Sequence, residues 1–390
     1  MRARWPSASG PVVTGLISAG GTACFAALRL WLAADGDITK FVRAALPYSD
    51  PRHVPAGLFV FRSDGYDGQF YYRLALDPAN LHRTAFGITL DHLFRLDRIG
   101  YPALTAVVSL GQHRFVPVAL VVVNVAALGA IGLAGGTLAA ESGRSALWGL
   151  LLPGYFGFFI CVGCDLTEPL AAACLLGGLI ACRRGHPLLA GLLLGYAAVT
   201  RETELVVPLA LAAIRLTAMA RRRTSPGTPD LAWLVPVVMF CCWQLILRFV
   251  TGSFVALSGF SGNSANGWPF GQFAGALRLN AELLWPATGA AYIWFAEVAT
   301  LIAFVVAAFA SLRSSTAPGY ERLAFAGFVI GLGVLSHSIW TGHADLRSID
   351  DCYLLAVLVL LGSLRKRLGL LTAMLALTSV IAAAHQALYL

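Results

Sequence analysis

Residues 65–73, with the sequence GYDGQFYYR, place an acid, an amide, three aromatic side chains and an arginine in one short stretch. The pattern from Asp67 onward predicts a short helix over residues 68–76. The Asp67 carboxylate suits two roles: it could be the N-cap of that helix, or it could accept a proton from a reacting hydroxyl. Asp64 and Gln69 lie beside Asp67, and these polar neighbours favour the second role.

The predicted helix also has an apolar face. Phe70, Tyr71 and Leu74 recur at helical spacing and share a face that could lie on a membrane surface. The structural alternative is that the aromatic residues only form an interface belt.

Other polar residues that could serve chemistry lie at the predicted ends of later apolar segments. With Asp67 and Asp64 as candidate catalytic acids, the candidate binding residues are Gln69, Tyr71, Arg73, Asp165, Glu168, Arg201, Glu202, His337, His343 and Arg347. Ionisable groups at membrane depth are costly, so they mark either a function or a paired buried network. A single polar cavity on one side of the membrane accounts for this set most simply.

Each of these candidates has a structural alternative. Arginine binds phosphate through its planar fork, which makes Arg347 and Arg201 the first candidates for an anion and Arg73 the third. The alternative is a salt bridge that closes a helix end, from Arg201 to Glu202 or Glu204, or from Arg347 to Asp345, Asp350 or Asp351.

The remaining candidates are also open to two interpretations. Asp165 and Glu168 are three residues apart, so on one helix they would share a face and could bind sugar hydroxyls or an acceptor. Helix capping by Asp165 or Thr167 explains the same residues equally well. The two histidines could contact phosphate or sugar, or could be hydrogen-bonding residues at helix ends.

The composition identifies the environment in which these residues act. The chain has 390 residues, of which 58% are hydrophobic and 12% are charged. A soluble domain carries about 25% charged residues, so we predict a polytopic all-α membrane protein. The net charge of +8 comes from short basic clusters between apolar runs, which excludes nucleic acid as the expected partner.

The apolar segments predict one integral membrane domain over residues 1–390 with about eleven crossings. They cover residues 12–34, 115–139, 145–163, 168–182, 187–200, 205–220, 231–250, 287–311, 321–340, 352–364 and 368–388. Residues 35–114 form a large first outer loop, and its apolar run 101–110 is too short to cross, which predicts a re-entrant or juxtamembrane segment.

The basic clusters orient this arrangement. With a cytoplasmic N-terminus, the clusters at 183–184, 221–223 and 365–367 all face the cytoplasm, as the positive-inside rule expects. The acidic and polar segments then all face outward. The sequence thus predicts a multi-pass protein of a bacterial inner membrane whose polar site faces the periplasm.

The stretches YDGQFYYRLALDP, DLTEPLA and TRET resemble motifs of bacterial GT-C-like glycosyltransferases, which act on cell-surface glycopolymers. More loosely, they are similar to those of the GPI mannosyltransferases. In this resemblance Asp67 matches the general base of the first loop and Glu168 matches a later glutamate. Tyr66 replaces the tryptophan of the mannosyltransferases, and an Asp-x-Asp motif is missing, so the use of a divalent metal stays open.

The resemblance implies transfer of a sugar from a polyprenyl-phosphate donor to a glycan, lipid or protein acceptor. In that reaction the acceptor hydroxyl loses a proton as it attacks, and the leaving lipid phosphate needs a cation. The alternatives are a lipid-linked glycan flippase or another transporter, and a scaffold without catalysis. A transporter would carry ionisable groups near the bilayer midplane, whereas these candidates lie at one surface.

Overall fold

The computed structural model describes residues 9–62, 65–221, 223–256, 269–285, 288–335, 337–363 and 368–389. The α-helices are α1 (Ser9–Leu32), α2 (Gly68–Leu76), α3 (Gly100–Val108), α4 (Val116–Glu141), α5 (Gly157–Gly163), α6 (Glu168–Arg183), α7 (Pro187–Thr200), α8 (Val206–Ala220), α9 (Leu231–Thr251), α11 (Gly271–Leu283), α12 (Gly289–Ser311), α13 (Gly319–Leu332), α14 (His337–Thr341), α15 (Asp350–Leu361) and α16 (Leu368–Leu388). The 3-10 helices are η1 (Ile38–Val42), η2 (Leu93–Arg98), η3 (His113–Phe115), η4 (Ala146–Leu151), η5 (Glu202–Leu205), η6 (Thr228–Asp230) and η7 (His343–Ile349).

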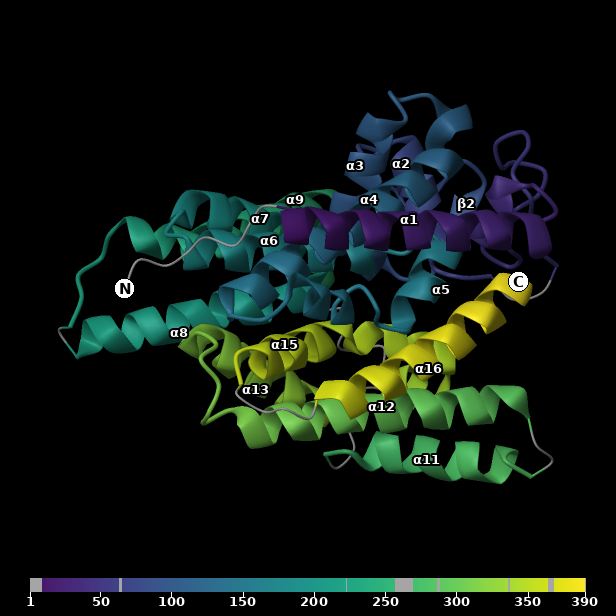
Figure 1. Cartoon of the computed structure of the whole chain (residues 1–390). Coiled ribbons are helices and arrows are strands. Elements are labelled where there is room, and N and C mark those ends of the chain that lie inside the picture. Colours follow the sequence, from purple (N-terminus) through teal and green to yellow (C-terminus); the bar gives the residue numbers. More distant parts are fainter. Residues whose placement is uncertain are drawn as a thin grey trace.

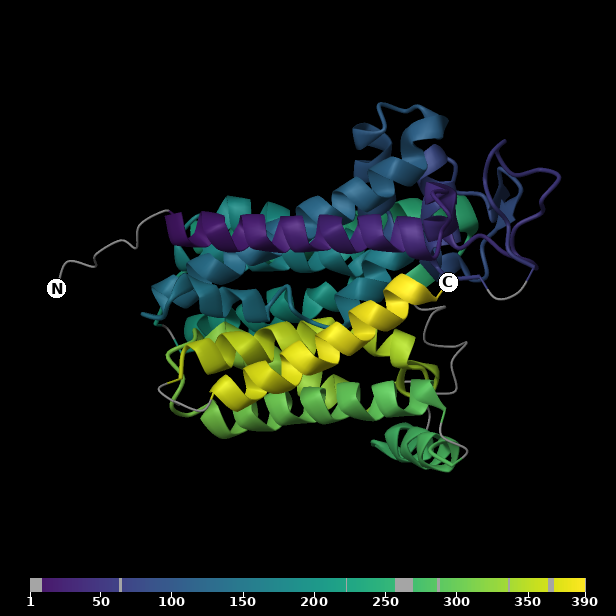
Figure 2. The same cartoon turned by 45° about the vertical axis from the view of Figure 1, so that its right-hand side comes forward.

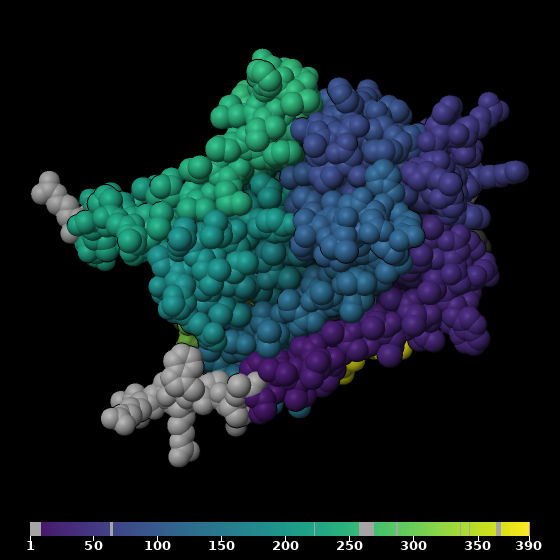
Figure 3. All heavy atoms as spheres, turned by 90° about the horizontal axis from the view of Figure 1, so that it is seen from above, coloured from purple at the N-terminus to yellow at the C-terminus, as the bar shows by residue number. Residues whose placement is uncertain are grey.

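The long helices run roughly side by side in a bundle (Figures 1 and 2). Helix α1 packs along α4, and α6, α7 and α9 follow in the same part of the bundle. Helices α12, α13, α15 and α16 form the other part, and α11 lies outside it against α12 and α14. Residues 35–114 gather over one end of the bundle, as the blue shades of Figure 3 show.

The predicted all-α class is confirmed, and the apolar helices are consistent with the predicted membrane protein. Within the described residues, six helical segments are long and apolar enough to cross a membrane: Ser9–Leu32, His113–Glu141, Glu202–Ala220, Thr228–Thr251, Gly289–Ser311 and Leu368–Leu388. Helix α7 is apolar but shorter. The count of eleven crossings therefore stays a prediction.

Two predicted helices are interrupted. Residues 145–163 fold as η4 and α5 rather than as one helix. The break contains Pro153, which lacks a backbone N–H and disfavours a helical residue before it. Residues 321–340 likewise divide into α13 and α14.

The first outer loop is folded. Helix α2 begins and ends where the sequence predicts, and α3 supplies the short helix expected near residues 101–110. The strands β1 (Thr84–Ala85) and β2 (Ile88–Thr89) form an antiparallel hairpin. Positive φ angles at Phe86 and Gly87 fit the tight turn between them.

The prediction that one face of α2 lies on the membrane is wrong, because every residue of α2 is buried. Gly68 lies so close to the end of α5 that a Cβ atom there would be 2.2 Å from the carbonyl oxygen of Cys164. Helix α2 is therefore packed into the protein, and the residue before it, Asp67, is held against the ends of the bundle helices.

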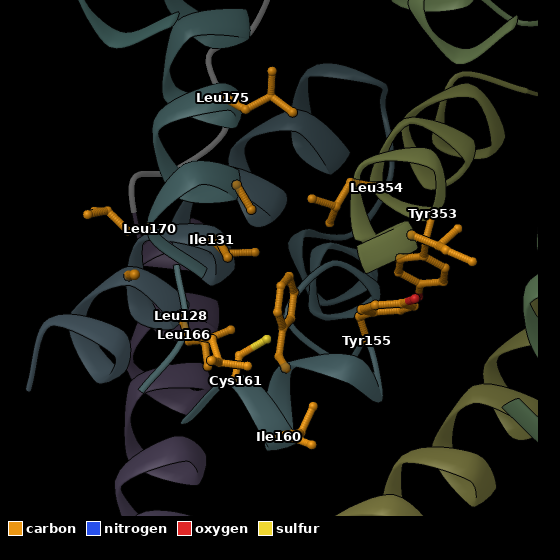
Figure 4. Close-up of a cluster of buried hydrophobic side chains, with 14 of the residues drawn as sticks. Leu128, Ile131, Tyr155, Ile160, Cys161, Leu166, Leu170, Leu175, Tyr353 and Leu354 are labelled. Carbon is orange, nitrogen blue, oxygen red and sulfur yellow. The ribbon is translucent and has the colours of Figure 1, made fainter. Parts of the chain in front are cut away.

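An apolar core lies between α4, α5, α6 and α15 (Figure 4). Leu128, Ile131, Cys161 and Leu175 contribute to it, and Tyr155 stacks on Tyr353 with ring centroids 4.7 Å apart. Because such a core is densely packed, it holds the ends of these helices in fixed positions.

The two ends of α6 carry separate groups of ion pairs. At its last residue, Arg183 donates both Nε and Nη2 to Glu321, at 2.7 and 2.6 Å, and Arg184 pairs with Glu141 at 3.1 Å. At its first residue, Glu168 joins the candidate site. A helix of this length separates the two groups by about 22 Å.

Candidate functional site

Asp67 is the residue before α2, but it does not cap that helix. Its backbone is helical, with φ −59° and ψ −26°, and its side chain makes no capping hydrogen bond. The predicted capping role is therefore wrong. Oδ2 of Asp67 instead lies 2.7 Å from Nη1 of Arg95 and 3.0 Å from Nη2 of Arg347.

The two arginines extend this contact into a chain of ion pairs. Nη1 of Arg347 donates to Oε1 of Glu168 at 2.9 Å. Arg95 binds Asp91 with both arms of its guanidinium, at 2.9 and 2.8 Å. The Asp67 side chain is 19% exposed, whereas those of Arg347 and Glu168 are 6% and 2% exposed. Asp67 is thus the accessible acid between these two arginines.

The charge state of Asp67 follows from these neighbours. Burial alone would raise its pKa, but the guanidinium groups of Arg95 and Arg347 outweigh burial and lower the pKa of Asp67 below its ordinary value. Asp67 is consequently ionised at neutral pH. As long as both arginines stay in contact with it, it is also a weak base.

A tyrosine also contacts Arg347. The hydroxyl of Tyr66 donates to Oδ1 of Asp345 at 2.8 Å, and the Arg347 guanidinium lies over its ring, 5.1 Å from the centroid. Burial raises the pKa of Asp345, although Arg347 and the hydrogen bond from Tyr66 act in the opposite direction.

A second ion pair lies beside the first. Arg98 binds Glu202 with both arms of its guanidinium, at 3.0 and 2.7 Å, and also donates to the hydroxyl of Tyr71 at 3.2 Å. Arg95 and Arg98 both belong to η2, so this one short element supplies cations to Asp67 and to Glu202.

Arg201 follows α7 and contacts the start of α15. Its Nη1 pairs with Oδ1 of Asp350 and lies 3.4 Å from Oδ2 of Asp351. Its Nη2 donates to the carbonyl oxygen of Ser348 at 2.7 Å. The acid partners Asp350 and Asp351 were among the structural alternatives for Arg347; they bind Arg201 instead.

Two predicted site residues have side-chain partners outside these ion pairs. The side-chain oxygen of Gln69 accepts from Ser49 and from the backbone of Ala45, so it holds the outer loop together. Arg73 donates to the carbonyl of His82. Burial lowers the pKa of Arg73 to about 10, and nearby Asp77 opposes this change.

Asp165 and His337 are also separate from Asp67 and its partners. Asp165 has a positive φ of 51° and precedes α6, so it does not share a helical face with Glu168. Its buried carboxylate makes no hydrogen bond to any described residue. His337 begins α14 and is exposed. Asp64 and the side chain of His343 lie outside the described part of the structure.

Sequence reasoning missed Arg95 and Arg98. The signal that could have found them is their place in an outer loop, because the positive-inside rule leads us to expect few arginines there. An arginine that occurs against this rule, beside an acidic motif, is a candidate partner of that motif.

The described residues do not fit a divalent metal ion, a possibility that the sequence left open. Among them, no three His, Cys, Asp or Glu side chains are grouped so that they could hold one. The acids around Asp67 are already paired with arginines: Asp91 with Arg95, and Glu168 with Arg347.

Comparison with protein-family models, with curated proteins and with solved structures finds no match for the chain.

Asp97, between the two arginines of η2, joins this element to α9. It is 1% exposed, and its Oδ1 accepts from Nε2 of Gln244 at 2.7 Å. Burial, together with the charge of Glu202, raises the pKa of Asp97 to about 7, against the effects of Gln244 and Arg98. The contact between η2 and α9 therefore includes a group that titrates near neutral pH.

We expect this group to make the stability of the protein depend on pH. The stability that the protonated Asp97 carboxyl contributes is fully present below about pH 4, where folded and unfolded chains both hold the proton. This stability is lost as the pH rises to about 7. Asp97→Asn should remove this component. The measurement is the thermal unfolding midpoint in detergent across this range; a constant difference in midpoint between wild type and variant would contradict the expectation.

Proposed function

We propose that the protein is a membrane glycosyltransferase that moves a sugar from a polyprenyl-phosphate donor to a glycan, lipid or protein acceptor. The observation that carries the proposal is the position of Asp67, a partly accessible carboxylate held between Arg95 and Arg347. A carboxylate can take the proton of an acceptor hydroxyl, and guanidinium groups can bind the leaving phosphate. Both requirements of the reaction meet at this one place.

The proposed reaction is an inverting displacement. The acceptor oxygen forms a bond to the anomeric carbon while the bond from that carbon to the phosphate oxygen breaks. The phosphate leaves with the bonding electrons, and Asp67 receives the proton of the hydroxyl. When a donor phosphate draws Arg95 or Arg347 toward itself, Asp67 loses part of the charge that lowers its pKa, so it becomes a stronger base.

Transport of a lipid-linked glycan is the second candidate function. Glu297 favours it, because this acid is 2% exposed and lies within the long apolar helix α12. Buried acids within membrane helices are typical of transport pathways. The ion pairs around Asp67 have no evident use in that function, and for this reason we rank it second.

The orientation of the chain belongs to the same proposal. We propose eleven crossings of a bacterial inner membrane, with the N-terminus in the cytoplasm and Asp67 at the periplasmic side. The support is the separation of ion pairs at the two ends of α6, since the basic residues Arg183 and Arg184 are at the end opposite Asp67.

Cysteine labelling tests this orientation. A cysteine at His53, in the exposed outer loop, should react with an impermeant thiol reagent added to intact cells, whereas one at exposed Ser225 should react only after the cells are opened. Labelling of the wild-type chain, which has eight cysteines of its own, gives the background to be subtracted. Labelling of Ser225→Cys in intact cells, with His53→Cys protected, would reverse the orientation.

The function is tested with purified protein in lipid nanodiscs. A panel of radiolabelled polyprenyl-phosphate sugars is supplied with a membrane glycan fraction, and the label is followed from donor to acceptor. We expect one donor to lose its label. If every donor keeps its label but crosses the bilayer of protein-containing liposomes, transport replaces transfer as the function.

A further inference from the structure

The backbone on both sides of Arg347 is held by side chains from distant parts of the chain. The hydroxyl of Tyr155 donates to the carbonyl of Leu346 at 2.6 Å, and Arg201 donates to the carbonyl of Ser348 at 2.7 Å. Gly157 also lies directly behind Arg347, since a Cβ atom on it would be 2.7 Å from the Arg347 Cα. The place from which Arg347 reaches Asp67 is therefore fixed by its surroundings.

Arg201 is poorly suited to bind an anion itself. It is 2% exposed, and it already contacts Asp350 and Asp351. Thr203 donates to Oδ2 of Asp351 at 2.9 Å, and the fully buried acid Glu204 follows in the same turn. The Arg201 guanidinium is thus already engaged by buried acids and by the carbonyl of Ser348, and an incoming phosphate would have to displace these partners.

We propose that Arg201 is a positioning residue. It anchors η7 through the carbonyl of Ser348 and so holds Arg347 where its guanidinium contacts Asp67 and Glu168 together. The role assigned to Arg347 rests on the proposed function, whereas the anchoring of η7 does not.

Hydrogen exchange tests the anchoring without any substrate. In Arg201→Gln, backbone amides of residues 343–349 should exchange about tenfold faster, because a hydrogen bond worth about 1.4 kcal/mol is lost. Arg183→Gln is the matched control: it removes an arginine that is also paired with a buried acid, but at the other end of α6. Unchanged exchange in Arg201→Gln, or an equal increase in Arg183→Gln, would overturn the proposal.

The single variant leaves Asp350 without its cation, which could prevent folding. The double variant Arg201→Gln with Asp350→Asn removes both charges and gives the same test in a neutral background. Tyr155→Phe removes only the hydroxyl that holds Leu346, and its effect should be confined to the same residues. Slow, wild-type exchange in both of these variants would show that η7 does not depend on these anchors.

A double-mutant cycle then separates positioning from direct binding, with a sugar-free polyprenyl phosphate as the probe. If Arg201 acts through Arg347, its loss should weaken binding in the wild-type background and add little in Arg347→Lys. If the losses of binding free energy in the two single variants add in full in the double variant, Arg201 is an independent phosphate ligand and the positioning role is wrong. If the wild type does not bind the probe, the proposed function fails, while the exchange measurement still decides the anchoring.

Discussion

Asp67→Asn is expected to slow sugar transfer by about 10²-fold or more while the donor still binds. The amide has nearly the shape of the carboxylate and can still accept hydrogen bonds from Arg95 and Arg347 through its oxygen. It cannot take the proton of the acceptor hydroxyl. Steady-state transfer, donor binding and thermal unfolding are measured together, so that a folding defect is distinguished from a catalytic one.

The matched control for Asp67→Asn is Asp91→Asn. Asp91 also binds Arg95, and its side chain is 13% exposed, but among the described residues the ion pairs of Arg347 are with Asp67 and Glu168 and not with Asp91. If the transfer rate falls only because an ion pair to Arg95 is lost, it should fall in both variants. If it falls because the base is lost, it should fall only in Asp67→Asn. Asp64→Asn is the second comparison: if Asp64 is the base, Asp64→Asn will lose transfer activity and Asp67→Asn will keep it. Full activity in Asp67→Asn would exclude Asp67 from the chemistry.

Arg347→Lys is expected to weaken binding of the donor phosphate by about 10- to 100-fold, since charge-assisted hydrogen bonds are worth about 1.5–3 kcal/mol. One arginine reaches Asp67 with Nη2 and Glu168 with Nη1. The single ammonium of lysine keeps the charge but not the planar fork. Binding of a polyprenyl phosphate by the purified variant gives the measurement, and wild-type affinity would remove Arg347 from the phosphate site.

The local elements of this site could be predicted from the sequence. Helix α2 has the predicted bounds: the Asp77-Pro78 pair marks its end, and its start follows Asp67 although the Asp67 side chain makes no capping hydrogen bond. Charge patterning indicated that Glu168 and Arg347 lie at the same side as Asp67, and the ion pairs of Arg347 confirm that the three residues meet.

The specific pairing could not be predicted. Arg347 has several acids near it in sequence, yet its ion pairs are with Asp67 and Glu168, far away along the chain. Packing of η7 against α5 decides this, and no local pattern contains that information. Arg95 was missed for a related reason: its partner Asp67 is distant enough in sequence that only the folded loop brings the two together.

The positions of Gln69 and Asp165 could not be predicted either. Both are polar residues near the acidic motifs, but Gln69 turns toward Ser49 and Asp165 is buried outside α6. Residue type shows that a polar side chain needs a partner, whereas the direction of that side chain depends on the backbone that surrounds it.

A single-turnover measurement shows whether Asp67 is the base of a sugar transfer. Purified wild type and Asp67→Asn are each mixed with less than one equivalent of radiolabelled polyprenyl-phosphate sugar, an excess of acceptor is added, and the label is followed over time. We expect that both proteins hold the donor and that only the wild type releases polyprenyl phosphate and transfers the label. Equal transfer by both proteins, or donor that stays intact on the wild type with every acceptor and sugar, would contradict it.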